Sequence, residues 1–159
     1  MNGCASVILK ARGQMSEVLD TGGRVLVVFD GGCGLCGRTV RWLLRRDRWD
    51  RLRFVAAESP RAAGVVARSG MEWEPGRPPG SILAVRGADG PEEQIFRRSA
   101  AVRTVLTELP QPWPAVAAAM GWVPQSALDL GYRLVARWRH RIWGRSCPAP
   151  DAEERRKFL

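Results

Sequence analysis

The distribution of apolar residues predicts a strand, a helix and a second strand in the first third of the chain. The five apolar, mostly β-branched residues at 25–29 form a run of the length of a buried strand. From about Gly34 to Arg48, apolar residues instead recur at helical spacing with arginines between them. The segment 52–56 returns to a strand pattern. This order is a βαβ unit, in which we expect the two strands to be parallel.

The following residues predict a second helix and a β-hairpin. Ser59 and Pro60 have the composition of an N-cap and a first helical residue, and Gly70 is expected to end that helix. A loop rich in proline and glycine, a strand, a turn and an antiparallel strand are then expected at 76–80, 81–85, 87–90 and 93–97.

The last part of the chain is predicted to be helical. Ser99 is expected to cap a helix whose apolar face comprises Val102, Val105, Leu106 and Leu109. After a proline-rich connection we expect a short helix at 115–120 and a longer helix, capped by Ser126, that runs to about Trp143. The apolar face of the longer helix is predicted to comprise Leu128, Tyr132, Val135 and Ile142.

A chain of 159 residues is of the size of one α/β domain. We expect a core at 24–110, a helical extension packed on the core at 111–146, and a tail at 147–159 that is charged and frayed from Asp151 onward. Residues 1–23 have little pattern and are expected to be disordered or wrongly included, with Met15 as the natural start and Cys4 as an artefact.

The strongest chemical feature is the pair Cys33 and Cys36, which lies where the first strand gives way to the first helix. Unpaired amides and the positive end of the helix dipole favour a thiolate at that place, and a thiolate is the species that attacks a disulfide. Cys33, nearer the helix start and expected to be more exposed, is predicted to be the nucleophile. Cys36 is predicted to be the resolving thiol.

The cysteine pair also allows two roles without redox chemistry. Half of a zinc site would need two further ligands, and the chain offers only Cys4, Cys147 and His140, none of them closely spaced. Alternatively, both cysteines are unreactive core residues. We expect no metal and no organic cofactor.

Asp30 allows three interpretations. As a carboxylate near the thiols it would raise a thiol pKa and oppose the effect of the helix. Asp before Gly31 and Gly32 is a common turn composition, in which the carboxylate accepts hydrogen bonds from free amides. Alternatively, a partly buried Asp30 deprotonates Cys36 when a mixed disulfide must break. Arg38 and Arg41 lie within the first turns of the helix, where their positive charge would favour the Cys33 thiolate, unless they form an ordinary solvated face.

The segment Phe29–Cys36, followed by Val40, Arg46 and Asp47, resembles the signature of the DCC family of thiol-disulfide oxidoreductases, named for its Asp-Cys-Cys pattern. Weaker similarities continue to about Pro148, at 81–85, Arg98-Ser99-Ala100, Asp129, Tyr132, Ala136-Arg137, Gly144-Arg145 and Cys147-Pro148.

This resemblance implies a thioredoxin-like core, with the order β-α-β-α-β-β-α, and disulfide exchange. Gly31, Gly32, Gly34, Leu35 and Arg38 would then shape the substrate site. Folds of this kind usually carry a cis-proline opposite the thiols, for which Pro79 is the candidate, although a trans loop proline is an equal alternative. Cys147 would be an auxiliary thiol or, more simply, a packing residue.

The charge of the chain adds an alternative function. The net charge of +9 comes almost wholly from arginine, and the predicted last helix carries Arg133, Arg137, Trp138 and Trp143. The simplest role of Trp113, Trp122, Trp138 and Trp143 is to line the core or a groove. Alternatively, the basic helix lets a non-enzymatic thioredoxin-like module contact an anionic partner or membrane surface. No nucleic-acid motif accompanies it, so we expect no nucleic-acid partner.

We otherwise expect a cytoplasmic enzyme, because four irregularly spaced cysteines do not form a disulfide framework. Its expected partners are a disulfide-containing protein or a small thiol, and an electron donor that the sequence does not identify.

Overall fold

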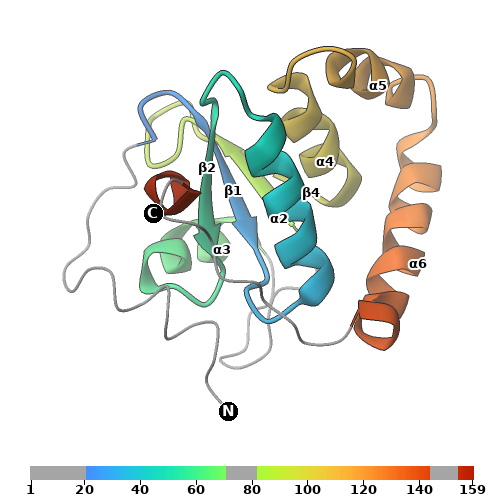
Figure 1. Cartoon of the computed structure of the whole chain (residues 1–159), viewed down its shortest axis with the longest axis horizontal. Coiled ribbons are helices and arrows are strands. Elements are labelled where there is room, and N and C mark those ends of the chain that lie inside the picture. Colours follow the sequence, from blue (N-terminus) through green and yellow to red (C-terminus); the bar gives the residue numbers. More distant parts are fainter. Residues whose placement is uncertain (1–20, 71–81, 144–153) are drawn as a thin grey trace.

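The computed structural model describes residues 21–70, 82–143 and 154–159. The elements of the core are β1 (Val25–Phe29), α2 (Gly34–Arg46), β2 (Leu52–Ala56), the 3-10 turn η1 (Pro60–Ala62), α3 (Ala63–Arg68), β3 (Leu83–Arg86), β4 (Gln94–Arg97) and α4 (Arg98–Thr107). They are followed by α5 (Trp113–Met120), α6 (Gln125–Trp143) and the 3-10 turn η2 (Glu154–Lys157). The predicted thioredoxin-like order of the core and the helical continuation are confirmed (Figure 1).

The described strands form one four-stranded sheet with the order β2-β1-β3-β4. β1 and β2 are parallel, as the βαβ pattern predicts, and Phe29 at the end of β1 lies opposite Ala56 at the end of β2. β3 is antiparallel to both β1 and β4. Since β1 and β2 end side by side, the residues that follow the two strands lie close together at the same end of the sheet.

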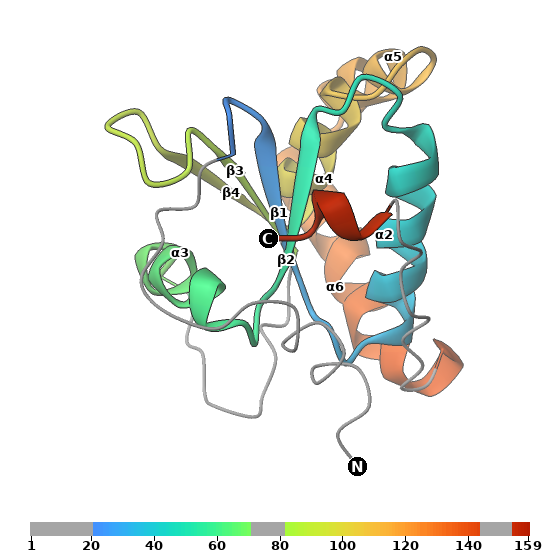
Figure 2. The ribbon, with the colours of Figure 1, turned by 60° about the vertical axis from the view of Figure 1, so that its left-hand side comes forward.

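Helices cover both faces of this sheet (Figure 2). Alternate residues of β1 point to opposite faces: Val27 packs in the cluster on the side of α2 and α4, whereas Val28 packs with Val65 and Val66 of α3. Burying each such side chain contributes about 1.5–3 kcal/mol. β1 is therefore buried on both sides, which explains its uninterrupted apolar sequence.

Several predicted boundaries differ from the structure. α2 ends at Arg46 rather than at Arg48, since Asp47 turns the chain toward β2 and its carboxylate accepts hydrogen bonds from the amides of Arg51 and Leu52. The prediction that Ser99 caps α4 is wrong, because the N-cap is Arg97 and Ser99 lies inside the first turn.

The helix α6 begins at Gln125, and the Pro124 carbonyl accepts the amides of Ala127 and Leu128. Ser126 therefore lies inside α6 and does not precede it, contrary to the prediction.

Four of the weaker sequence similarities meet in space where α6 contacts the core. The Ser99 hydroxyl donates a hydrogen bond to the carboxylate of Asp129, and this bond lowers the pKa of that carboxyl below its usual range. One turn along α6, the Tyr132 hydroxyl accepts the amide hydrogen of Ile82 at 2.9 Å, directly before β3. These two contacts fix α6 against α4 and the start of β3.

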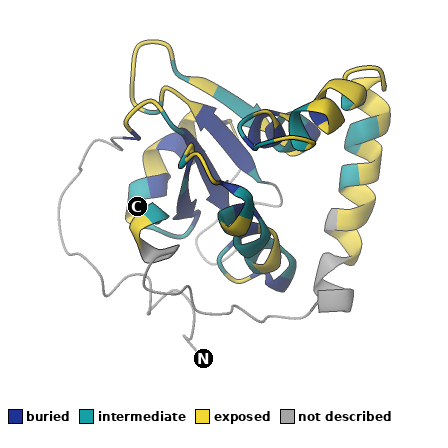
Figure 3. Cartoon of the chain, turned by 45° about the horizontal axis from the view of Figure 1, so that its top comes forward, coloured by how far each residue is buried: buried dark blue, intermediate teal, exposed yellow. Residues whose placement is uncertain are grey.

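The outer side of α6 is exposed (Figure 3). Leu128 and Tyr132 are half-buried against the core, as their positions predict, but Val135 is 53% exposed and so does not belong to the packed face. The side chain of Ile142 lies outside the described part. Across the described helices, none is long and apolar enough to cross a membrane.

The chain returns to the sheet at its C-terminal end, beside β2 (Figure 1). Phe158 forms a parallel bridge with Phe54 of β2 and packs edge-on against Phe29, while the Leu159 amide donates to the Phe54 carbonyl at 2.9 Å. The expectation of a frayed tail is therefore wrong for 154–159, since these residues cover the exposed edge of β2.

Candidate active site

The candidate site begins where β1 ends. Asp30, Gly31 and Gly32 form a turn, Cys33 occupies the N-cap of α2, and Gly34 is the first helical residue. Cys33 has an extended backbone, with φ −96° and ψ 119°, and its carbonyl accepts the Gly37 amide at 3.0 Å. This geometry places the two thiols one helical turn apart at the amino end of α2, as the sequence predicts.

The two thiols differ in exposure in the opposite sense to the prediction. Neither cysteine forms a disulfide, but Cys33 is only 1% exposed, whereas Cys36 is half-buried and packs against the core cluster. Asp30 and Gly34 are buried as well, whereas Gly31 is half-buried and Gly32 is exposed. The expectation that Cys33 is the more exposed thiol is therefore wrong.

Asp30 builds the turn that precedes the thiols. Its side chain is buried, and Oδ1 accepts the Gly32 amide at 2.9 Å, while its carbonyl accepts the Cys33 amide at 3.3 Å. The bond to Oδ1 is that of an Asx turn and the bond to the carbonyl that of a β-turn, and both agree with the structural interpretation of Asp30. Neither bond tests whether Asp30 accepts a proton from Cys36, so that interpretation stays a prediction.

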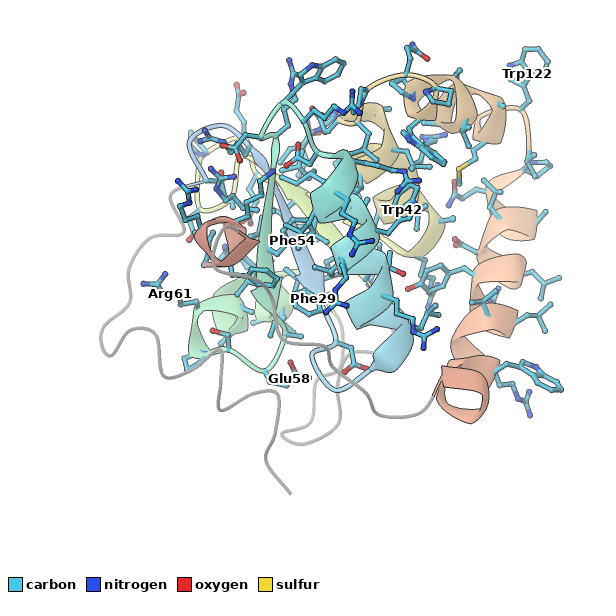
Figure 4. All side chains as sticks on the ribbon, viewed as in Figure 1. Phe29, Trp42, Phe54, Glu58, Arg61 and Trp122 are labelled. Carbon is cyan, nitrogen blue, oxygen red and sulfur yellow. The ribbon has the colours of Figure 1, made fainter. Side chains whose placement is uncertain are left out.

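Glu58 is a residue of the site that the sequence pattern did not reveal. It follows β2 by two residues, and Oε2 accepts the Gly31 amide at 3.2 Å from across the edge of the sheet (Figure 4). A Cβ atom added to Gly31 would lie 3.1 Å from this oxygen, so the glycine permits the close approach. Because β1 and β2 are parallel and end in register, an acid just after β2 was the available sequence signal.

The surroundings of Glu58 favour the protonated form of its carboxyl group. Burial raises the pKa of the Glu58 carboxyl above its usual range, and the nearby charge of Asp30 adds to the rise. Hydrogen bonds from the backbone of Glu58 itself and of Gly31 and Gly32 oppose this shift. The turn before Cys33 is thus held by two carboxyl groups, one from within the turn and one that follows β2.

The remaining predicted site residues lie as follows. Gly32 is exposed, Leu35 is half-buried, and Arg38 is exposed on α2 one turn beyond Gly34. Pro79 and Cys147 lie outside the described residues. Within the parts of the chain that the structure describes, no three His, Cys, Asp or Glu side chains gather as metal ligands do.

Comparison with known proteins supports the interpretation of this site. The family model of the DCC1-like thiol-disulfide oxidoreductases matches residues 27–145. The chain belongs to this family. The match includes the thiols, nearly the whole sheet and α6, so the resemblance inferred from the Cys33–Cys36 motif is confirmed.

Two proteins are similar in sequence to most of this chain. A chloroplastic DCC family protein of Arabidopsis thaliana is 29% identical over 133 residues, which cover 84% of this chain and 73% of the relative. The uncharacterized protein YuxK of Bacillus subtilis (strain 168) is 26% identical over 136 residues, which cover 84% of this chain and 93% of the relative. No solved structure matches the chain significantly.

Proposed function

We propose that this protein exchanges disulfides with protein or small-thiol substrates through Cys33 and Cys36. The Cys33 thiolate attacks one sulfur of a substrate disulfide, forms a mixed disulfide and releases the other substrate sulfur as a thiolate. The Cys36 thiolate then attacks Cys33 Sγ, which forms the Cys33–Cys36 disulfide and releases the second substrate thiolate. The substrate gains two electrons, and an external dithiol or two glutathione molecules reduce the protein again.

The placement of Cys33 at the N-cap of α2 is the observation that carries this proposal. The amides of the first helical turn point toward the N-cap, and together with the helix dipole they favour an anion there without any basic side chain. Cys36 lies in the same turn, close enough along the helix to resolve the mixed disulfide. Since the Cys33 thiol is buried, the residues that cover it must move before a substrate sulfur can reach it.

The other residues of the site complete the proposal. Asp30 holds the turn and is proposed to accept the Cys36 proton in the resolving step, and the surfaces of Gly31, Gly32, Gly34, Leu35, Arg38 and Pro79 are proposed to contact the substrate. We propose a cytoplasmic setting and a reducing direction of exchange, since a reducing compartment keeps such a pair as dithiol.

The proposal is tested by equilibrating the full chain against graded mixtures of reduced and oxidised glutathione. Alkylation traps the free thiols, and mass spectrometry of peptides reads each cysteine separately. A reversible disulfide between Cys33 and Cys36 with a defined potential supports the function, and the potential gives its direction. If the two cysteines never pair with one another, the function is wrong.

A second candidate function, binding to an anionic membrane surface, rests on the outer side of α6. Leu130, Leu134 and Trp138 recur at spacings of four residues, and all are more than half exposed. Arg133 and Arg137 are exposed beside them. We name these five residues the outer face of α6. An apolar stripe flanked by arginines matches the boundary between acyl chains and anionic headgroups better than it matches a polar nucleic-acid backbone.

Trp122 lies three residues before the start of α6, projects away from the body of the molecule and is 92% exposed (Figure 4). An exposed indole of this kind suits a membrane interface. Cosedimentation with vesicles of phosphatidylglycerol and phosphatidylcholine tests the idea, with pure phosphatidylcholine vesicles as the comparison.

We expect Trp138→Ser to weaken binding to the anionic vesicles at least about fivefold, from the loss of buried apolar area. The matched control is Trp49→Ser, because Trp49 is equally exposed but lies between α2 and β2. Equal loss in both variants contradicts the proposal. If Trp138→Ser instead abolishes a concentration-dependent dimer, the outer face of α6 joins two copies of the chain.

A further inference from the structure

The turn before Cys33 contains three successive amides, and all three donate to oxygen atoms. The Gly31 amide donates to Glu58 Oε2, the Gly32 amide to Asp30 Oδ1, and the Cys33 amide to the Asp30 carbonyl. Two of these acceptors belong to carboxyl groups. The positive ends of the Gly31 and Gly32 amides are therefore directed at carboxyl oxygens rather than at a thiolate.

Glu58 reaches this turn from a different element. The Ala57 amide donates to the Phe29 carbonyl at 2.8 Å, which continues the parallel pairing of β2 with β1 by one residue. The Ser59 amide then donates to the Ala56 carbonyl at 2.9 Å, so the chain turns away just after Glu58. This tight corner aims the Glu58 side chain at Gly31, and the absent Cβ of Gly31 gives it room.

We propose that Glu58 is a positioning residue of the dithiol site, which fixes the turn through Gly31 and, when ionised, disfavours the thiolate form of the pair. This inference rests on the proposed disulfide exchange and adds a control of its potential. Among the described residues, Asp30 contacts the turn from within it and Glu58 from the end of β2, and Arg38 and Arg41 follow along α2. The two carboxylates oppose the effect of the helix dipole on the thiols.

The variant Glu58→Gln separates charge from position. Glutamine keeps an oxygen that can accept the Gly31 amide but removes the negative charge. We expect the pKa of the more reactive thiol to fall by about half a unit, the order of magnitude of the effect of one solvent-screened charge. The equilibrium with glutathione should then shift about threefold toward the dithiol form, because a stabilised thiolate stabilises the reduced protein.

The measurements are the alkylation rate of Cys33 and Cys36 against pH, read by peptide mass, and the glutathione equilibrium of the same proteins. Glu92→Gln is the control. Glu92 is exposed in the turn between β3 and β4, so this substitution removes the same charge far from the thiols. Wild type and Glu58→Gln should converge at acidic pH, where Glu58 carries a proton in the wild type and both side chains are neutral. The proposal would be overturned if the pH profiles of alkylation gave the same thiol pKa for the wild type and Glu58→Gln.

A wild-type measurement keeps the test independent of any variant. The amide resonance of Gly31 should move with pH as Glu58 titrates, with a midpoint above that of an ordinary glutamate. A Gly31 resonance that does not respond to this titration overturns the proposed contact. If wild-type Cys33 and Cys36 never form a disulfide, the exchange function fails, whereas the alkylation comparison and the Gly31 titration still decide the role of Glu58.

Discussion

The ammonium group of Lys157 lies 2.7 Å from Oδ2 of Asp47, a carboxylate whose side chain is 0% exposed. Asp47 ends α2 and accepts the amides of Arg51 and Leu52, so it joins the end of the helix, the start of β2 and the returning C-terminal segment. Lys157 thereby stabilises the connection from α2 to β2, which is far from it in the sequence.

Replacing Lys157 by methionine should destabilise the protein by about 2–4 kcal/mol, because it leaves the buried Asp47 carboxylate without its counter-charge. Urea unfolding of the full chain measures this loss. Arg48→Met removes one positive charge from an exposed position nearby and should change the stability by less than about 0.5 kcal/mol. Equal effects of the two variants would show that the ion pair contributes nothing specific.

The roles of the two thiols are tested by single serine variants. In Cys36→Ser, the proposed attacking thiol of Cys33 remains, so a mixed disulfide with glutathione or a substrate protein should accumulate and persist. In Cys33→Ser, the same adduct should form at least about tenfold more slowly. Cys36 is the more accessible thiol in the structure. If the adduct forms faster at Cys36 than at Cys33, Cys36 is the attacking thiol and the two roles are reversed.

Two substitutions of Asp30 distinguish its structural role from proton transfer. Asp30→Ala removes the acceptor of the Gly32 amide and should cost about 1–2 kcal/mol of stability. Asp30→Asn keeps an oxygen at that place, so its melting temperature should stay near that of the wild type. A resolving step that slows at least about tenfold in Asp30→Asn would assign proton transfer to the carboxylate, whereas an unchanged rate would leave only the turn.

The pH dependence of stability should report Glu58. Since its pKa is higher in the folded protein than in the unfolded chain, its contribution to stability is fully present below the unfolded value and is lost as the pH rises through the folded value. Glu58→Gln lacks this loss. The variant should therefore gain stability relative to the wild type between pH 4 and pH 7 in urea titrations, and a constant difference would contradict the raised pKa.

The contact between α6 and the core can be tested at Tyr132. Tyr132→Phe keeps the ring but removes the oxygen that accepts the Ile82 amide, which should cost about 1 kcal/mol. Amide exchange at Leu83 and Ala84 should also become faster, because the start of β3 loses its tether. If exchange in β3 stays unchanged, the hydrogen bond does not hold the strand.

The sequence by itself determined the elements and the place of the chemistry. The apolar run at 25–29 and the helical spacing after it depend on local periodicity, and they located β1, α2 and the thiols between them. The βαβ pattern also predicted the parallel pairing of β1 and β2, because crossover connections leave little choice. The same residues carried the resemblance to the DCC family.

Only the tertiary structure decided which side chains meet. The burial of Cys33, the approach of Glu58 to Gly31 and the pairing of Lys157 with Asp47 join residues that no local period connects. Helix caps showed the same limit: Ser99 has the composition of a cap, yet its hydroxyl bonds Asp129 of α6 instead. Periodicity fixes which face of an element is apolar, whereas the partner of a polar side chain depends on how the elements pack.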